Sequence, residues 1–211
     1  MATTKYSDLL DDVLPSLGAD PSDPVTEYAI KRAVIDFCAG SWVWKIFPDN
    51  ITTTANEAAY DLEPPAGADI ATIVSIELDG VPLTNKSPEW LNQNVPGWRT
   101  TQATPKHYTQ VDTEQVILAP LPPTSTSVLT LTLALQPSQS STGFPSWIAS
   151  QFMYAIADGA LSRLMLMPNK PWTDLQNGQD RRSQFNAAIA NARAGAAGAL
   201  GRAPVRVTPQ H

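Results

Sequence analysis

The only cysteine of the chain, Cys38, lies among aromatic residues in the stretch DFCAGSWVWKIFPDN, Asp36 to Asn50. Trp42 and Trp44 follow it closely. A lone cysteine beside aromatic side chains could be a nucleophile in a pocket. It could equally belong to the last turns of a buried helix that runs into a strand. Nucleophilic chemistry requires a histidine, a cation or a helix N-terminus close to the sulfur, because the thiolate is the reactive form.

The spacing of apolar residues around Cys38 favours the second interpretation. Asp23 and Pro24 predict the start of a helix, with an acidic N-cap followed by a proline at the first helical position. Cys38 then lies near the C-terminal end, where the helix dipole disfavours an anion, and His107 is far away in a proline-flanked loop. We therefore predict that Cys38 is a buried small hydrophobe and that Trp42 anchors the packing at the end of the helix. The predicted apolar face contains Ile30, Val34, Phe37, Cys38 and Ser41.

Other patterns that support catalysis are missing from the sequence. It contains no G-x-S-x-G, P-loop, H-E-x-x-H or C-x-x-C motif. One internal histidine and one cysteine are too few for a His/Cys metal site. A glycosidase uses two carboxylates, and the sequence offers two acid pairs, Asp11 with Asp12 and Asp61 with Glu63. Acids in a helix or a turn are ordinarily solvated, so we interpret both pairs as solvated surface residues. We predict no enzymatic activity, no cofactor and no metal.

Charge is distributed unevenly along the chain. Residues 1–180 contain nine Lys and Arg against twenty Asp and Glu, a net charge of −11, whereas residues 181–211 contain five Arg and no acid, a net charge of +5. An acidic body repels nucleic acid at long range. Near the start of the last predicted helix, Arg181 and Arg182 could contact phosphate, but a carboxylate partner is the simpler interpretation. Charged residues make up only 16% of the chain, which favours a surface that lies against neighbouring proteins.

The composition also bounds where the protein acts. A single cysteine excludes an internal disulfide framework. No apolar run approaches the roughly 18 residues needed to span a bilayer, and the first twelve residues lack the basic and apolar segments of a signal peptide. We expect a protein made in a reducing cytoplasm, with no membrane partner.

The expected fold class is α+β, with helices at both ends of the chain and strands between them. Apolar periodicity predicts one helix pair in residues 1–47 and another in residues 143–194, and we expect the two pairs to form one four-helix lobe. Residues 48–137 are expected to form an inserted small antiparallel β-sandwich or barrel domain, and residues 195–211 an extended C-terminal arm. The predicted packing residues of the lobe are Phe37, Cys38, Trp42, Phe152, Trp172 and Phe185.

Local signals predict the main elements of the inserted domain. In VLTLTLALQP, residues 128–137, leucines alternate with small or polar residues, which predicts a strand with one buried face. Asp79 and Gly80 follow the β-branched run of residues 70–78, and this dipeptide predicts a two-residue hairpin turn. Residues 87–94 begin with Ser-Pro and predict a short capped helix.

Several stretches of the sequence together resemble a known family. They are YSDLLDDVLPSLGADPSDPVTEYAIKRAVIDFCAGSWVW from Tyr6, the hairpin IVSIELDGVPL from Ile73, and YAIADGALSRLMLMPNKPWTD from Tyr154 followed by DRRSQFNAAIANARA. The chain resembles the head-to-tail adaptor, or connector, proteins in the necks of tailed bacteriophages, the tail tubular protein A-like family. The likeness covers nearly the whole chain, and its motifs are hydrophobic and turn signatures rather than catalytic ones.

This resemblance implies a structural virion protein in the neck between capsid and tail, assembled in the host cytoplasm. Such adaptors build a ring, usually a dodecamer of identical copies, between the portal protein and a tail or nozzle protein. Double-stranded DNA would pass through the lumen during genome ejection without specific binding, which suits an acidic wall. The C-terminal arm would dock on the portal. The resemblance assigns this portal docking to Leu200, Arg202, Val205, Arg206 and Val207.

Two other functions stay open on the sequence alone. Trp90 and Trp98, with the loops around them, are compatible with a carbohydrate-binding or hydrolytic module of a phage tail. A stopper or tail-terminator protein of the same neck is the second alternative, although such proteins are mostly β and four predicted helices argue against it.

Overall fold

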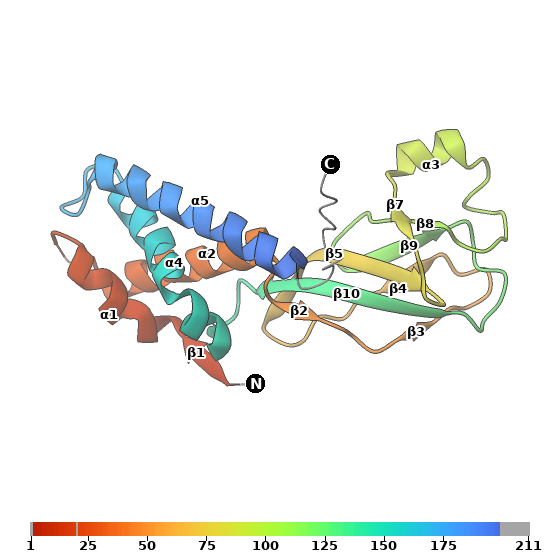
Figure 1. Ribbon diagram of the computed structural model, residues 1–211, viewed down its shortest axis with the longest axis horizontal. Helices are drawn as coiled ribbons and strands as arrows, with labels where there is room; N and C mark the ends of the chain where they lie inside the picture. Colours follow the sequence, from red (N-terminus) through yellow and green to blue (C-terminus); the bar gives the residue numbers. More distant parts are fainter. Residues whose placement is uncertain (1, 20, 199–211) are drawn as a thin grey trace, which may run out of the picture. The chain divides into compact units, whose positions relative to one another are not determined.

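The computed structural model describes residues 2–19 and 21–198, and the chain divides into two compact units. One unit combines residues 1–43 with residues 142–211, and we call its described part the helical unit. The other, residues 44–141, is the β unit. Figure 1 labels the helices and strands of each. The mixture of helices and mainly antiparallel strands confirms the predicted α+β class.

The helical unit is built from both ends of the chain. It contains β1 (Thr3–Lys5), α1 (Leu10–Val13), α2 (Asp23–Ser41), β11 (Gly143–Pro145), α4 (Ser146–Met165) and α5 (Leu175–Gly198), with 3-10 turns at Tyr6–Leu9 and Leu14–Ser16. The three long helices α2, α4 and α5 lie side by side and pack on one another (Figure 1). No helix in the described ranges is both long and apolar enough to cross a membrane.

The first predicted helix is shorter and less regular than its apolar pattern indicated. It consists of one α-helical turn, α1, between two 3-10 turns. The N–H of Lys5 donates to Oδ2 of Asp8 at 3.0 Å, which caps the first turn, and Pro15 lacks the N–H that a continuing helix would need. Its buried side chains are Tyr6, Leu9 and Val13. The helical unit therefore consists of three long helices and one short segment, rather than two matched helix pairs.

The ends of α2 follow from local chemistry. Ser22 rather than Asp23 occupies the N-cap position, and a proline stands in the first turn. At the other end Trp42 has a φ of 56°, the left-handed conformation that commonly terminates helices, and its N–H donates to the carbonyl oxygen of Cys38 at 3.0 Å. This conformation is unusual for a bulky residue. The guanidinium of Arg193 on α5 lies 3.7 Å from the centre of the Trp42 ring and covers it.

The structure corrects the predicted start of the C-terminal arm. An extended arm was expected over residues 195–211, but α5 continues to Gly198, so residues 195–198 are helical. The stretch around them is rich in alanine, which has the highest helix propensity of all residues and outweighs the neighbouring glycines. The remainder of the predicted arm, residues 199–211, lies outside the described residues.

Two glycines allow the long helices to approach closely. A Cβ atom at Gly159 on α4 would lie 2.7 Å from the ring of Phe185 on α5 and 3.0 Å from the Cβ of Ala33 on α2. A Cβ atom at Gly40 on α2 would lie 2.7 Å from Cγ2 of Ile189 on α5. Real Cβ atoms do not sit at such distances, so this packing requires glycine at both positions.

A two-stranded sheet joins the beginning of the chain to the start of α4. Strand β1 pairs antiparallel with β11. The hydroxyl of Thr4 donates to Oγ of Ser146 at 3.0 Å, and the ring of Tyr6 stacks on Phe144 with 5.6 Å between their centres. Segments separated by about 140 residues in the sequence thus close the helical unit.

The β unit contains two sheets and one short helix. Its elements are β2 (Lys45–Ile46), β3 (Ile51–Thr52), β4 (Ala59–Asp61), β5 (Ala68–Leu78), β6 (Val81–Pro82), β7 (Thr84–Asn85), α3 (Pro88–Asn94), β8 (His107–Thr109), β9 (Gln115–Ala119) and β10 (Val128–Pro137). The first sheet has the order β2-β10-β5-β6, with β3 also paired to β10, and the second has the order β4-β9-β8-β7. Both sheets end in edge strands within the described residues, so of the predicted sandwich or barrel the closed barrel is excluded.

The long pair β5 and β10 supplies most of the buried leucine and isoleucine side chains of the first sheet. Leu129, Leu131, Leu133 and Leu135 of β10 are each at most 1% exposed, which confirms the predicted inward face. Of the alternating residues only Thr130 is open to solvent, because Thr132 and Ala134 are also buried. The second half of β10 is therefore covered on both faces, which alternation alone does not reveal.

The hairpin predicted at Asp79 and Gly80 is present between β5 and β6. Leu78 pairs with Val81, and the two turn residues have φ angles of 51° and 79°. Two positive φ values in succession define a type I′ turn, whose twist matches that of the flanking strands. Oδ1 of Asp79 also accepts a hydrogen bond from the N–H of Val128 at 2.8 Å. The turn side chain thereby ties the hairpin to the start of β10.

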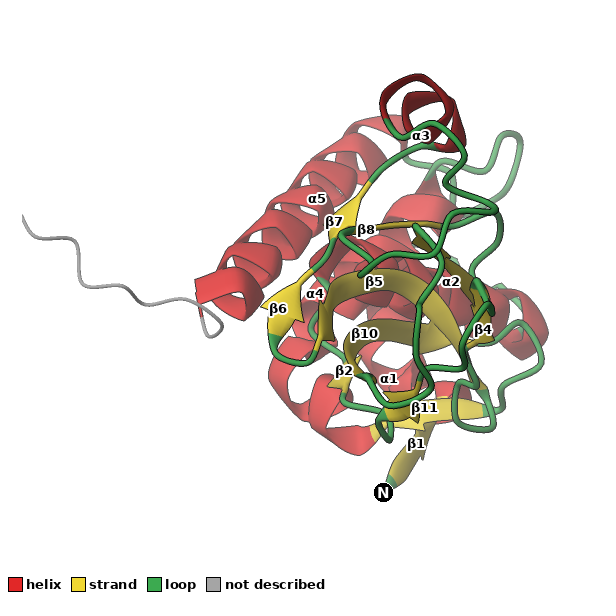
Figure 2. Cartoon of the chain, turned by 90° about the vertical axis from the view of Figure 1, so that its right-hand side faces the viewer, coloured by secondary structure: helices red, strands yellow, loops and turns green. Residues whose placement is uncertain are grey.

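The second sheet departs from the all-antiparallel prediction at β7 and β8. These strands pair in parallel, which requires a crossover, and the intervening chain forms α3 (Figure 2). Ser87 caps α3 as predicted, since its Oγ accepts a hydrogen bond from the N–H of Trp90 at 3.2 Å. A small cluster of Leu91, Trp98 and Ala119 buries this helix and the loop after it.

Candidate functional site

The environment of Cys38 confirms the predicted burial of its side chain. Its side chain is fully buried in the helical unit, and burial raises the pKa of the thiol to about 12. The thiol therefore stays protonated at neutral pH. Within residues 2–19 and 21–198, no group of three or more His, Cys, Asp and Glu side chains is arranged to hold a metal ion.

Trp90 and Trp98, on which the carbohydrate-binding alternative rests, do not present a clear surface for stacking a sugar ring. Trp98 is only 3% exposed, its Nε1–H donates to Oδ1 of Asn92 at 3.0 Å, and the guanidinium of Arg99 lies 4.0 Å from its ring centre. Trp90 is half-buried, with the ammonium of Lys86 at 4.6 Å from its ring centre and the ring of His107 in edge contact. Cations occupy the positions that a pyranose ring would need, which argues against the carbohydrate-binding alternative.

Most basic residues of the β unit gather around α3. Of its four Lys and Arg residues, Lys86, Arg99 and Lys106 lie in this region, together with His107. Burial, followed by the nearby charges of Lys86 and Lys106, lowers the pKa of His107. Nδ1 of His107 also lies 2.5 Å from the hydroxyl of Thr84. Lys86 and Arg99 already lie over tryptophan rings, and His107 already contacts the Thr84 hydroxyl, so these side chains are engaged within the β unit.

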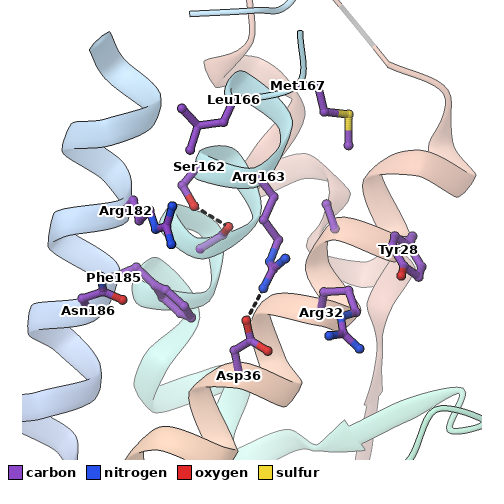
Figure 3. Close-up of a pocket in the computed structure, with 12 residues that line it drawn as sticks. Tyr28, Arg32, Asp36, Ser162, Arg163, Leu166, Met167, Arg182, Phe185 and Asn186 are labelled. Atoms are coloured by element: carbon purple, nitrogen blue, oxygen red, sulfur yellow. Dashed lines mark hydrogen bonds and ion pairs between the residues drawn. The ribbon is translucent and has the colours of Figure 1, made fainter. Parts of the chain in front are cut away.

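A group of polar and charged side chains lies around an open pocket of the helical unit. A pocket of about 410 Å³ opens among α2, α4 and α5 (Figure 3). We call it the arginine pocket, and its lining consists of Tyr28, Ala29, Arg32, Asp36, Gly159, Ser162, Arg163, Leu166, Met167, Arg182, Phe185 and Asn186. Gly159, where α4 and α5 approach closely, is among these residues, and Oγ of Ser162 donates back to its carbonyl oxygen at 2.8 Å.

The electrostatics of the arginine pocket are unbalanced. Figure 3 shows Arg163 directed at Asp36, with which it forms an ion pair across α4 and α2. Arg32 and Arg182 form no ion pair or hydrogen bond with any other described residue. The pocket therefore carries two uncompensated guanidinium groups, which can bind carboxylates through paired N–H donors.

The two adjacent arginines of α5 have different roles. Arg181 donates from Nη1 to Oδ1 of Asp158 on α4 at 2.5 Å, which confirms the predicted carboxylate partner for this residue. Arg182 points into the arginine pocket instead. Neighbouring residues on a helix are about 100° apart around its axis, so one can serve internal packing while the next faces solvent.

The predicted packing residues lie in the helical unit, but with different burial. Phe37 and Cys38 are 0% exposed and Phe185 is 6% exposed. The ring centre of Phe37 lies 4.9 Å from that of Phe152 and 6.3 Å from that of Phe185, so residues of α2, α4 and α5 meet there. The half-buried residues of this set are Phe152, Trp42 and Trp172.

The predicted portal-docking residues cannot be placed on the structure. Leu200, Arg202, Val205, Arg206 and Val207 all lie outside the described residues. The arginine pocket, by contrast, was missed by the sequence reasoning. Its arginines are spread over 150 residues, and the only local signal was that Arg32 and Asp36 fall off the apolar face of α2, one turn apart.

The comparisons with known proteins give one result. The family model described as SU10 adaptor protein matches residues 4–208. This match covers both units and most of the C-terminal segment. No curated protein matches the chain.

Proposed function

This chain belongs to the SU10 adaptor protein family, and from that membership we propose that it forms a ring between the portal protein and the tail or nozzle of a tailed phage. The family is one of bacteriophage head-to-tail adaptors, which are structural components of the virion and bind other head or tail proteins. The proposal adds a ring of identical copies, in the manner of tail tubular protein A-like adaptors, with a copy number of twelve.

The observation that carries the proposal is the match over residues 4–208, which spans every element of both units apart from the first residue of β1. Several features of the molecule support it. Cys38 is buried with a strongly raised pKa, and the acids Asp36 and Asp158 are engaged in ion pairs rather than facing each other across a cleft. The chain offers binding surfaces instead of reaction chemistry.

The acidic character of the chain suits the proposed passage of DNA. Residues 1–180 carry a net charge of −11, and a wall of that sign repels phosphate rather than gripping it. The duplex would then slide through the lumen without specific binding. A lumen lined by lysine and arginine would instead bind the backbone in a strongly salt-dependent way.

We place the portal contact in the segment after α5. This segment contains Arg202 and Arg206 and no acid, and basic side chains are suited to acidic grooves on a partner protein. Because α5 continues to Gly198, the docking segment is residues 199–211 rather than 195–211. A truncation after Gly198 removes it without removing any described element.

The test is the binding of the full chain to purified portal rings, compared with the chain truncated after Gly198. We expect the truncated chain to lose at least about tenfold in affinity while its circular dichroism and melting temperature stay unchanged. Arg202→Ala with Arg206→Ala should reproduce much of the loss, whereas Arg193→Ala, a matched removal of an arginine on α5, should not. Unchanged portal binding by the truncated chain would show that this segment is not the anchor.

A further inference from the structure

We propose that the arginine pocket of one copy binds the acidic segment of a second copy, and we define the acidic segment as residues 8–17. This inference rests on the proposed function, because it identifies a contact by which neighbouring subunits of the ring recognise each other. The two surfaces share no lining residue, so each copy offers one of each.

Two of the cations that line the pocket have no ion-pair partner among the described residues. Arg32 and Arg182 make no ion pair with any described residue, whereas Asp36 already neutralises Arg163. These guanidinium groups stand on two helices, α2 and α5, and line one opening (Figure 3). Two cations from different helices around one pocket favour a ligand with two carboxylates over a single acid.

The pocket also offers apolar contact beside its cations. Tyr28 is 61% exposed, which is high for a large hydrophobic side chain. Leu166 and Met167 are only partly buried and lie at the end of α4. A ligand that places aliphatic side chains on these residues would remove apolar surface from water at about 25 cal/mol for each Å².

The acidic segment has the complementary composition. Asp11 and Asp12 form the only pair of adjacent acids in the chain. Both are exposed, and neither forms an ion pair or hydrogen bond with another described residue. Leu10 and Leu14, one helical turn apart, are only half-buried on the same segment. The segment therefore presents two carboxylates beside two aliphatic side chains.

The segment is also held rigidly enough to act as a ligand. Leu9 is 2% exposed and Val13 is fully buried, and both anchor it in the helical unit. The carboxylate of Asp8 accepts the N–H of Lys5, which fixes the first turn. A preorganised segment loses little conformational entropy on binding, so even a few contacts can give measurable affinity.

Three other acids of the helical unit already have partners. Asp36 and Asp158 are already paired with arginines, and Asp174 accepts the N–H of Asn177 at the start of α5. A contact between two different surfaces of identical copies is heterologous, and such contacts generate rings when the rotation between copies closes. The proposed pairing is therefore of the type that a ring needs.

The test uses cross-linking between full-length copies. One variant carries Ser16→Cys in the acidic segment, the other Asn186→Cys at the pocket, and a short bismaleimide joins cysteines that come close. Buried Cys38 should not react. We expect dimers joined between positions 16 and 186 in about tenfold excess over those formed with Thr126→Cys, an exposed control position in the β unit. High salt should reduce this yield, since both surfaces are solvent-exposed in the free chain.

Charge-reversal variants distinguish the proposed pairing from non-specific association between copies. Arg32→Glu with Arg182→Glu should lower the 16-to-186 yield at least about tenfold, and so should Asp11→Lys with Asp12→Lys. Mixing these two variants should restore it, because each reversed pocket then meets a reversed segment. Glu57→Lys with Glu63→Lys, at exposed acids of the β unit, changes the net charge by the same amount as Asp11→Lys with Asp12→Lys and should have little effect.

The outcomes distinguish this inference from the proposed function. No preferred cross-link, or a cross-link that ignores the reversed charges, overturns the pairing of pocket and segment. Portal binding that still depends on residues 199–211 would in that case leave the adaptor role intact. If portal binding does not depend on residues 199–211 but the cross-link responds to the reversed charges, the proposed portal anchor is overturned. The contact between copies is then retained.

Discussion

The two units of this protein reach stability by different routes. The helical unit is assembled from residues far apart in the sequence, and its long helices meet through glycine contacts and the rings of Phe37, Phe152 and Phe185. The β unit is one continuous insertion whose first sheet is centred on the pair β5 and β10. The helical unit requires shape complementarity between distant segments, whereas the first sheet of the β unit requires alternation of buried and exposed side chains along a strand.

Both units hold cations over aromatic rings, as Arg193 lies over Trp42 in the helical unit, but the ion pairs Arg163–Asp36 and Arg181–Asp158 belong to the helical unit. In the β unit, Lys86 and Arg99 lie over tryptophan rings. In the helical unit, Arg163 and Arg181 are paired with acids, but Arg32 and Arg182 are not paired within the described residues. Unpaired guanidinium groups around an open pocket are available to a partner, and this supports the proposed contact between copies.

The largest effect expected within either unit comes from truncating its core. Phe37→Ala should destabilise the helical unit by about 3–5 kcal/mol, because a fully buried ring in contact with two other rings is replaced by a cavity. Leu133→Ala should destabilise the β unit by about 2–5 kcal/mol. Native-state hydrogen exchange followed by mass spectrometry would report the two units separately.

This pair of variants tests whether the units are energetically distinct. If they are, each variant lowers amide protection mainly in its own unit. Equal loss of protection in both units after either substitution would mean that they unfold together, and the contrast drawn above would then apply only to their architecture.

A smaller effect is expected at the helix contacts that glycine permits. Gly159→Ala should cost about 1–3 kcal/mol, because its new methyl group would meet the buried ring of Phe185 at 2.7 Å. Gly195→Ala is the matched control on α5, where nothing lies within 4 Å of the added Cβ atom. That substitution should be neutral or stabilise by up to about 1 kcal/mol through helix propensity. Urea unfolding of both variants measures the difference, and equal stabilities would contradict the close-packing account.

The elements of the fold that could be predicted from the sequence are those whose sequence patterns involve neighbouring residues. The inward leucines of β10, the turn at Asp79 and Gly80, and the cap at Ser87 each involve neighbours in the sequence, and the structure confirms all three. The end of α5 was placed too early because alanine and glycine give opposing signals there. The sequence left a sandwich and a barrel open, because strand order, including the parallel pair β7 and β8, cannot be inferred from any single strand.

The candidate surface was harder to predict than the fold. The arginine pocket requires Arg32, Arg163 and Arg182 to converge from three helices, and no spacing within the sequence encodes that convergence. The separate roles of Arg181 and Arg182 likewise depend on where α4 lies against α5. Buried Cys38 was predictable, by contrast, because its place on the apolar face of α2 already determined its environment.

The smallest expected effect compares the units at alkaline pH. Burial raises the pKa of Cys38 from its ordinary value of 9.0 to about 12, so the unfolded chain loses this proton at lower pH than the folded helical unit does. The stability contributed by the protonated thiol is therefore complete below pH 9.0 and declines between pH 9.0 and about 12. At pH 10 the expected loss is about 1 kcal/mol, since each pH unit above the unfolded pKa is worth about 1.4 kcal/mol.

In the β unit the corresponding groups are Tyr60 and Tyr108, whose pKa values burial raises above their ordinary value of 10.0. The helical unit should therefore begin to lose stability about one pH unit before the β unit. Pulse proteolysis in urea at pH 8 and pH 10, with fragments identified by mass spectrometry, measures each unit. Cys38→Ala should flatten the response of the helical unit alone. If the wild-type helical unit is equally stable at both pH values, the thiol is not as deeply buried in solution as its place on α2 requires.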